Sequence, residues 1–372
     1  MTCYRFELAG PGDDAALRRV MAQTPMDGSV SLTFQREPGY FNSNCVLGRE
    51  HQTIVCRDTE RNEIVGLGTR SARDMFVNGQ VTRVGYLSGL RSVEHARNRG
   101  LLARGYRFLR ELHDADPIAP EFYLTTIAEH NAVAIDQLTS RRAGLPSYHE
   151  LSRLHTLVLP IRRRPVSSKR ASLANCRVSQ SGSIQEVVEF LNERGAKKTF
   201  FPVYQPADFE QPHGTFRGLT TSSISVATRN GQIVGTAGVW CQRAFRQTIV
   251  SGYRPTVRLL RPLLNLWSRI SGGIQLPEIG SSLGAAFVCF PVISEEEPAV
   301  FHLLLQHLMQ VAPADAECLL LGLCEHDPLL AAARSMSRSE YTTKLYAVNW
   351  SAFPDALVGS GAGQYYLELG CL

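Results

Sequence analysis

Strand-like and helix-like hydrophobic patterns alternate along the first part of the chain. Residues 4–8 (YRFEL) have the pattern of a strand, and the apolar positions of residues 13–24 recur at helical spacing. Two further segments, 51–58 and 62–90, are strand-like, and the second contains Asn78-Gly79, a strong signal for a two-residue hairpin turn. The pattern predicts a strand, a helix and then an antiparallel meander.

Helices and strands alternate after the meander. A helix is expected from Gly100 to near Asp116, and a strand follows over 121–131 (EFYLTTIAEHN). Asn131 is well placed to cap a second helix. Residues 147–160 are expected to close the first half as a pair of strands.

A short basic segment divides the chain. Residues 161–182 are rich in Arg, Ser and Pro, and this composition favours a linker over a basic docking segment because short charge runs are usually solvated. With 372 residues, the chain is long enough for two domains. We therefore expect one domain over 1–160 and a second over 183–372.

The second half repeats pieces of the first half in the same order. The sequence EIVG around Ile64 returns as QIVG around Ile233, and EHN at 129–131 returns as EHD at 325–327. Each EH pair follows an apolar strand and opens a helix. This repetition at matching places predicts a duplicated fold.

The composition is that of an ordinary globular protein. Hydrophobic residues make up 44% of the chain and charged residues 20%, so we expect packed domains. The net charge of +5 suits an anionic small ligand better than nucleic acid, and neither an RNP-like nor a zinc-finger pattern is present. Nine cysteines are scattered without a CxxC pair, which is typical of free thiols in a reducing compartment such as the cytoplasm.

Neither a metal site nor membrane contact is expected. The histidines form no HExxH motif, and no apolar run is long enough to cross a bilayer. Residues 253–270 (YRPTVRLLRPLLNLWSRI) place arginines and leucines at helical spacing, which allows a membrane-surface helix. Packing over the sheet of the second domain is favoured instead, because Pro262 interrupts the pattern and amphipathic helices mostly cover cores.

Two arginines and a glycine precede the helix that follows the meander. In the segment 97–100 (RNRG), the positive charges stand beside the free backbone N–H groups and the partial positive charge of a helix N-terminus. Such a segment is either a solvated basic turn or a cradle for an anion. The local spacing alone leaves both interpretations open.

This turn and the order of the elements around it resemble the GCN5-related N-acetyltransferase (GNAT) superfamily. The fingerprint of that family is a strand followed by [QR]-x-x-G-x-[GA], and residues 97–102 (RNRGLL) match it except at Leu102. A later N-x-x-A-x-x-x-Y helix resembles 131–138 (NAVAIDQL), with Leu138 in place of the tyrosine. The resemblance implies an α+β fold of two tandem GNAT-like domains, each a mixed, mostly antiparallel central sheet flanked by helices.

The resemblance also implies that acetyl-CoA is the co-substrate and that the turn is an anion cradle for its pyrophosphate. The residues that it assigns to acetyl-CoA are Leu90, Ser92, Val93, Arg97, Asn98, Arg99, Gly100, Leu101, Leu102, Ala103 and Asn131. In the second copy, residues 295–297 (EEE) stand at the corresponding turn, where three carboxylates would repel a pyrophosphate. One CoA site is therefore expected, in the first domain.

Acetyl transfer to an amine needs a base for the acceptor and an acid for the departing thiolate. The candidate bases are Glu94, Glu129 and His130, and the candidate acids are Tyr86, Tyr123 and Tyr148. Glu94, Glu129 and Tyr86 form the preferred set, although a polar turn, a helix entry and a half-buried strand are the more ordinary explanations for these residues. We expect a cytoplasmic N-acetyltransferase that acts on a primary amine of a small molecule, peptide or protein. The alternative is a non-catalytic acyl-CoA-binding regulatory protein.

Overall fold

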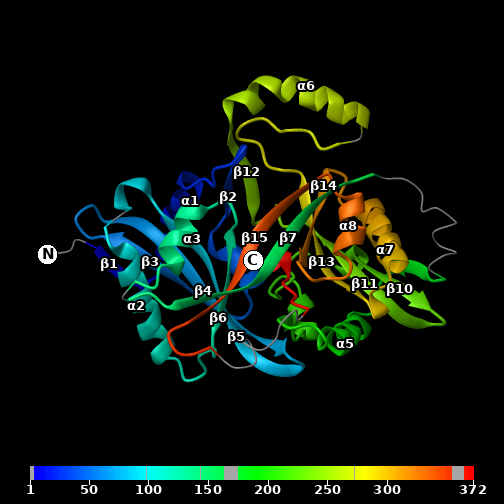
Figure 1. Ribbon diagram of the computed structural model, residues 1–372, viewed down its shortest axis with the longest axis horizontal. Coiled ribbons are helices and arrows are strands. Elements are labelled where there is room, and N and C mark those ends of the chain that lie inside the picture. Colours follow the sequence, from blue (N-terminus) through cyan, green and yellow to red (C-terminus); the bar gives the residue numbers. More distant parts are fainter. Residues whose placement is uncertain (1–3, 98, 143, 163–174, 272, 354–363) are drawn as a thin grey trace.

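One long sheet with helices packed along it forms the body of the protein (Figure 1). The computed structural model describes residues 4–97, 99–142, 144–162, 175–271, 273–353 and 364–372. The strands are β1 (Tyr4–Leu8), β2 (Val30–Gln35), β3 (Glu50–Asp58), β4 (Glu63–Val77), β5 (Gln80–Ser92), β6 (Tyr123–Ala128), β7 (Ser147–Pro160), β8 (Arg177–Gln180), β9 (Phe201–Pro202), β10 (Ile224–Arg229), β11 (Gln232–Trp240), β12 (Gln247–Tyr253), β13 (Ala285–Ile293), β14 (Cys318–Cys324) and β15 (Ser339–Asn349). The helices are α1 (Asp14–Gln23), α2 (Leu101–Asp114), α3 (Ala132–Thr139), α5 (Ile184–Gly195), α6 (Pro255–Ser271), α7 (Pro298–Val311) and α8 (Leu330–Met336).

Strands β3, β4 and β5 form the antiparallel meander that the sequence predicts. Val77 and Gln80 close the β4–β5 hairpin, and Asn78 and Gly79 between them have φ values of 50° and 80°. Positive φ at both central residues defines a type I′ turn, which the Asn-Gly pair favours. The local signal was therefore sufficient to place this hairpin.

Helices α2 and α3 also lie where the sequence predicts them. Tyr106 and Leu109 of α2 are buried against the sheet, but the helix begins at Leu101, one residue later than expected. Asn131 caps α3, because its side-chain oxygen accepts a hydrogen bond from the backbone N–H of Ala134 at 3.1 Å.

The order of the strands shows that the two halves of the chain exchange a strand. Across the sheet they run β1-β3-β4-β5-β6-β15-β7-β14-β13-β11-β10-β8, with β9 beside β4 and a separate β2–β12 ribbon. Neighbours are antiparallel except for the parallel pairs β5–β6 and β13–β14. Strand β15 lies between β6 and β7, and β7 in turn pairs with β14. Each half thus gives its last long strand to the sheet of the other, and these two strands, β7 and β15, lie side by side near the centre of Figure 1.

The exchanged strands bury side chains among residues of the opposite half. Leu157 of β7 is fully buried in a core built mainly from β11, β13, β14 and α7, and Leu345 of β15 is fully buried beside Val84 and Leu124. The predicted α+β class, with a mostly antiparallel central sheet flanked by helices, is confirmed. The boundaries at 160 and 183 stay a prediction, since parts of both halves share one core.

One expected pair of strands is wrong. Residues 147–160 form a single strand, β7, which pairs with β15 over nearly its whole length and with β14 over its last seven residues. A turn inside this segment would break both ladders. The partner strands that keep β7 straight come from the second half of the chain.

The expected packing of residues 253–270 is also wrong. Helix α6 runs through Pro262 without a break, and it stands away from the sheet, at the top of Figure 1. Leu259 is 80% exposed, Trp267 70% and Ile270 76%. The amphipathic pattern therefore predicted the helix correctly and its position incorrectly.

Candidate active site

Strand β5 parts from β6 halfway along its length. Within the described residues, β5 and β6 are paired in parallel only up to Tyr86 and Leu124. On its other edge β5 carries a bulge against β4, at which Gly89 has a φ of +65°. The next residue, Leu90, is half exposed. The carbonyl of Leu87 still accepts a hydrogen bond from the hydroxyl of Thr125 on β6, at 2.9 Å. Backbone N–H and C=O groups of β5 beyond Leu87 are thus turned toward an edge that β6 no longer covers.

The basic turn lies at the end of this same edge. A 3₁₀ turn, η3 (Glu94–Ala96), leads from β5 to exposed Arg97 and Arg99, and Gly100 occupies the N-cap position of α2 with φ +68°. A glycine has no side chain with which to cap the helix, so the first-turn N–H groups of α2 are left for another partner. A Cβ built on Gly100 would meet no protein atom within 4 Å, so the space beside the turn is open.

The other residues assigned to acetyl-CoA lie along the same path, with two exceptions. Leu101, Leu102 and Ala103 form the half-buried first turn of α2, and Ser92 ends β5. Val93 is buried, and its N–H donates to the carbonyl of Val65 at 2.9 Å. Asn131 is occupied as the cap of α3. Asn98 lies outside the described residues.

Tyr86 stands at the last paired position before β5 and β6 separate. Its hydroxyl lies 2.8 Å from the hydroxyl of Thr126 on β6, so the two side chains bridge the strands at that point. Burial raises the pKa of Tyr86 to about 12, and the hydroxyl is therefore protonated at neutral pH. The hydroxyl therefore has a proton to donate, although its raised pKa makes it a weaker acid than an exposed tyrosine.

The other two tyrosines are engaged in hydrogen bonds. The hydroxyl of Tyr123 accepts from Arg70 at 3.3 Å, and Tyr148 on β7 shares a short hydrogen bond with Tyr106 on α2. Burial raises the pKa of both Tyr123 and Tyr148. The hydroxyl of Tyr123 also lies 3.1 Å from Nδ1 of His113 on α2, so both tyrosines tie α2 to the sheet.

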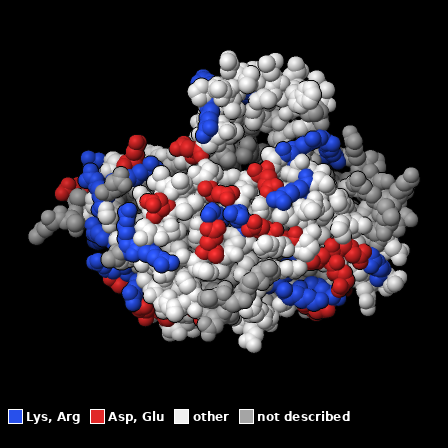
Figure 2. Space-filling view, viewed as in Figure 1, with Lys and Arg blue, Asp and Glu red and all other residues white. Residues whose placement is uncertain are grey.

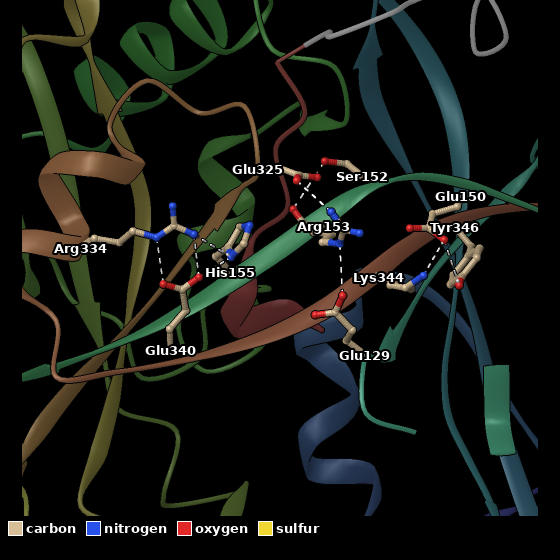
Figure 3. A network of polar contacts seen from close by, with 10 residues as sticks. All are labelled: Glu129, Glu150, Ser152, Arg153, His155, Glu325, Arg334, Glu340, Lys344 and Tyr346. Carbon is tan, nitrogen blue, oxygen red and sulfur yellow. Dashed lines mark hydrogen bonds and ion pairs between the residues drawn. The ribbon is translucent and has the colours of Figure 1, made fainter. Parts of the chain in front are cut away.

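Glu129 belongs to a network of charges on the exchanged strands (Figure 3). Arg153 of β7 lies between two glutamates, Glu129 at 3.3 Å and Glu325 at 2.9 Å. These are the equivalent residues of the repeated EHN and EHD sequences, and they approach the arginine from the ends of β6 and β14. The duplicated motif thus brings one carboxylate from each half onto the same arginine. Glu94, by contrast, is exposed in η3.

Further ion pairs flank Arg153 on β7 and β15. Glu340 accepts two hydrogen bonds from Arg334, at 2.8 and 2.9 Å, and its other partner is Nδ1 of His155 at 2.5 Å. On the opposite side, Lys344 pairs with Glu150 at 2.9 Å. Figure 2 shows red and blue side chains alternating over the middle of the face in view. The pairs join the strands at the seam between the two halves.

We expect Glu340→Gln to destabilise the protein at neutral pH and to have less effect in acid. The hydrogen bonds from Arg334, with help from His155, lower the pKa of Glu340 to about 2, below the value of about 4.3 for an unfolded chain. The ionised carboxylate therefore contributes stability above about pH 4.3, and this contribution is lost as the pH falls toward 2. Urea unfolding at several pH values from 7 to 3 measures the difference in free energy of unfolding between the parent protein and Glu340→Gln, with exposed Glu60→Gln as the control. If this difference in free energy does not change with pH, the lowered pKa of Glu340 is contradicted.

Three arginines gather where the β2–β12 ribbon ends beside β5. Arg36 follows the last residue of β2 and Arg246 precedes the first residue of β12, so the two lie opposite each other just past the ladder. Arg91 lies over the ring of Phe34, two residues before Arg36, at 6.0 Å from the ring centroid. Within the described residues Arg36 makes neither a hydrogen bond nor an ion pair, whereas Arg246 donates to the backbone oxygen of Leu372.

Electrostatics make this cluster a candidate anion site. Burial lowers the pKa of Arg36, Arg91 and Arg246. Repulsion from Arg91 lowers the pKa of Arg36 further, and repulsion from Arg36 lowers the pKa of Arg246 further. Like charges held together in a half-buried position cost free energy unless an anion offsets them. Nothing in the sequence pattern marked these residues, since their distances along the chain hide the cluster.

A cavity of about 560 Å³ opens beside His130. Its lining residues are Asp27, Gly28, Ser31, His130, Gly252, Tyr253 and Arg254. The ring of His130 also contacts Tyr341 of β15, with 5.6 Å between the centroids. The cavity therefore joins the end of β6 to the β2–β12 ribbon. No group of three or more His, Cys, Asp or Glu side chains in the described ranges is placed to hold a metal ion.

The overall fold recurs in solved structures, although no family model and no curated protein matches the chain. N-myristoyltransferase from Saccharomyces cerevisiae with bound myristoyl-CoA aligns over 95% of this chain and 84% of its own, at 11% identity and a TM-score of 0.57. A GCN5-related N-acetyltransferase from Sphaerobacter thermophilus aligns over 95% of this chain and 98% of its own, at 11% identity and a TM-score of 0.56. The glucosamine N-acetyltransferase region of a fungal multi-domain β-N-acetylglucosaminidase aligns over 93% of this chain and 38% of its own, at 12% identity and a TM-score of 0.57.

The chain has a tandem GNAT fold. Its first copy carries the arginine-glycine turn at the junction of β5 and α2. Its second copy repeats the backbone of this region. Strand β13 pairs with β14 in parallel and then parts from it, and a bulge against β11 places Phe290 at a positive φ, as Gly89 is in β5.

The chain itself fills the opening in the second copy of the GNAT fold. The N–H of Phe290 donates to the buried carboxylate of Glu368 at 2.8 Å, and the hydroxyl of Tyr366 donates to the same oxygen at 2.6 Å. A Cβ on Gly322 of β14 would lie 2.8 Å from Leu369. Residues 364–371 thus lie beside β13 and β14, at the position in the second copy that corresponds to the uncovered edge of β5 in the first copy.

The glutamates at the turn of the second copy have partners inside the protein. Glu297 accepts two hydrogen bonds from Arg229, both at 2.8 Å, and Glu296 lies 3.5 Å from Lys198. Pro298 begins α7, so one of the N–H groups of its first turn is missing. The turn of the second copy is thus closed by the protein's own contacts, whereas the turn of the first copy is open.

Proposed function

We propose that the chain is an N-acyltransferase that moves an acyl group, acetyl first of all, from its CoA thioester to a primary amine. The open N-terminus of α2 carries this proposal: Gly100 in a left-handed conformation, uncapped amides behind it and exposed Arg97 and Arg99 beside it. Phosphate oxygens accept hydrogen bonds from such amides and pair with arginines. The uncovered edge of β5 leads from this turn toward Tyr86 and suits the pantetheine arm.

The reaction needs one proton removed and one supplied. The amine nitrogen attacks the thioester carbonyl carbon, a base takes the amine proton, and the C–S bond breaks as the thiolate receives a proton. Tyr86 is the proposed acid, because it lies where the strands part and retains its proton at neutral pH. Glu94 and Glu129 remain the proposed bases. Exposed Glu94 is free to accept a proton, while Glu129 would first have to leave Arg153.

The arginine cluster favours an acceptor that carries an anionic group. Arg36, Arg91 and Arg246 lie beside the bulged end of β5, close to the place proposed for the thioester. A carboxylate near the reacting amine would relieve the repulsion among them and fix the direction of the amine.

A non-catalytic acyl-CoA-binding protein is the second candidate. Leu138, which stands in place of the family's tyrosine, is buried in the core, and Glu129 is held in an ion pair. Both observations weaken the case for catalysis without affecting the proposed acyl-CoA site.

Acyl-CoA titration followed by a thiol-release assay tests the proposal. Calorimetry is expected to give one acetyl-CoA per chain, and Arg97→Ala or Arg99→Ala is expected to weaken binding by about 1–3 kcal/mol, the range for charge-assisted hydrogen bonds. Arg107→Ala, an exposed arginine further along α2, is the control. Free CoA is then measured with matched amines that carry or lack a carboxylate. Binding without turnover of any amine would favour the regulatory protein, and two equivalent sites would contradict the assignment of the second copy.

A further inference from the structure

Helix α6 has its polar face turned inward and its apolar face turned outward. The inward stripe is half-buried and consists of Val257, Arg261, Asn265 and Ser268, spaced three or four residues apart. The opposite stripe consists of Leu259, Leu263, Leu266, Trp267 and Ile270, which are 55–80% exposed. In a helix that covers a core the apolar stripe faces inward. Here this apolar stripe faces solvent.

The structure holds α6 firmly in this orientation. Asn265 exchanges two hydrogen bonds with the backbone of Leu276, at 2.7 and 3.0 Å, and Arg261 donates to the same carbonyl at 2.9 Å. The stem below the helix is built from β12, which pairs with β2, and from residues 280–283, which bond to β12. The polar groups of the inward stripe are therefore bonded to the segment around Leu276 that follows the helix. The outward stripe has no cover in the described part of the chain.

The charge around α6 selects the partner. Residues 254–277 contain four arginines, at 254, 258, 261 and 269, and no Asp or Glu. Arg258 and Arg269 lie along one flank of the apolar stripe and, within the described residues, pair with no carboxylate. In a contact between two copies, α6 itself would supply arginines and no opposite charge. An anionic lipid surface offers both phosphates for the arginines and an apolar layer for the leucines and the tryptophan.

We propose that α6 is an interfacial helix that docks the protein on anionic membranes. The helix would lie parallel to the surface with Leu259, Leu263, Trp267 and Ile270 among the acyl chains and Arg258 and Arg269 at the phosphates. No helix in the described ranges has the length and hydropathy to cross a bilayer, so this is attachment to one face. Figure 2 shows the α6 lobe raised above the body with mostly uncharged side chains in view.

Docking would bring the candidate active site close to the lipid. The cavity beside His130 is lined by Gly252, Tyr253 and Arg254, at the base of the same stem. An acceptor amine or an acyl chain held in the membrane would then reach the cavity over a short distance. The docking inference itself rests on α6 alone and does not depend on the proposed function.

Vesicle binding tests the inference on the full-length chain. The probes are large unilamellar vesicles of phosphatidylcholine alone and of phosphatidylcholine with phosphatidylglycerol. Sedimentation is expected to show binding to the anionic vesicles, weaker at high salt, together with a blue shift of the emission from Trp267. Leu263→Glu or Trp267→Glu is expected to reduce binding at least about tenfold and Arg258→Ala about fivefold. Val133→Glu, at an exposed apolar position on α3, is the matched control and is expected to bind normally.

Two results would overturn the inference. One is the absence of binding to the anionic vesicles, or binding that survives Trp267→Glu. The other is self-association in solution that Leu263→Glu abolishes while vesicles are not bound, which would assign the apolar stripe to a second copy of the chain. Because all substituted side chains are exposed, unchanged melting temperatures will show that the variants fold.

Discussion

Replacing Gly100 by Ala is expected to abolish the rise in melting temperature that acetyl-CoA produces. At about 100 times Kd, a bound ligand stabilises a protein by about 2.7 kcal/mol, and the variant should lose most of this gain. The reason is steric. The N-cap position leaves open space beside the first turn of α2, and a Cβ there would stand where the phosphate oxygens have to reach the amides.

Gly100→Ala is also expected to destabilise the unliganded protein by about 1 kcal/mol, because residues with a side chain are strained in the left-handed region. Gly100 has a φ of +68° and lies outside the helix, so the higher helix propensity of alanine does not help. Gly231→Ala is the matched control. Gly231 sits in the β10–β11 turn at a φ of +80°, and a Cβ on it would also have no protein atom within 4 Å.

The comparison of the two variants separates strain from binding. Both should melt at similarly reduced temperatures without ligand, and only Gly231→Ala should keep the full increase with acetyl-CoA. An undiminished increase in Gly100→Ala would remove the main support for acyl-CoA binding at this turn.

Separating the two halves of the chain is expected to prevent both from folding. A fragment of residues 1–162 would lack β15, leaving β6 and β7 without the strand that lies between them. A fragment of residues 175–372 would lack β7, the neighbour of both β14 and β15. Each would expose unpaired strand edges and the apolar side chains that the exchanged strand covers.

Co-expression of the two fragments is expected to restore the fold, because every strand then has its partner. Affinity purification through a tag on one fragment, followed by thermal melting, measures this. The intact chain is the reference. A fragment 1–162 that melts cooperatively by itself would show that the first half is an independent domain, as the predicted boundaries at 160 and 183 suggest.

Elements with strong local signals could be predicted from the sequence. The Asn78-Gly79 turn, the cap at Asn131 and the buried face of α2 depend on residues within a few positions of one another. By contrast, β2 went unpredicted, because its partner is β12 and the two segments are more than 200 positions apart. The single strand at 147–160 was predicted as two for the same reason, since its partners also lie far along the chain.

The candidate site divides in the same way. The basic turn at 97–100 is a contiguous motif, so the residues alone were enough to single it out. Arg36, Arg91 and Arg246 come from three separate segments, and only the β2–β12 pairing and the bulge in β5 bring them together. The repeat of the EH motif could be recognised in the sequence. The ion pairs of both its glutamates, Glu129 and Glu325, with Arg153 could be recognised only in the structure.

By itself the sequence determined the periodic elements, the turns between adjacent strands, the duplication and the position of the basic turn, since each depends on interactions between near neighbours. The tertiary structure alone decided which half supplies each central strand, how residues 364–371 fill the opening in the second copy, and that the apolar stripe of α6 faces solvent. Hydrophobic periodicity specifies that a face is apolar. What covers that face depends on contacts between distant segments, which periodicity does not encode.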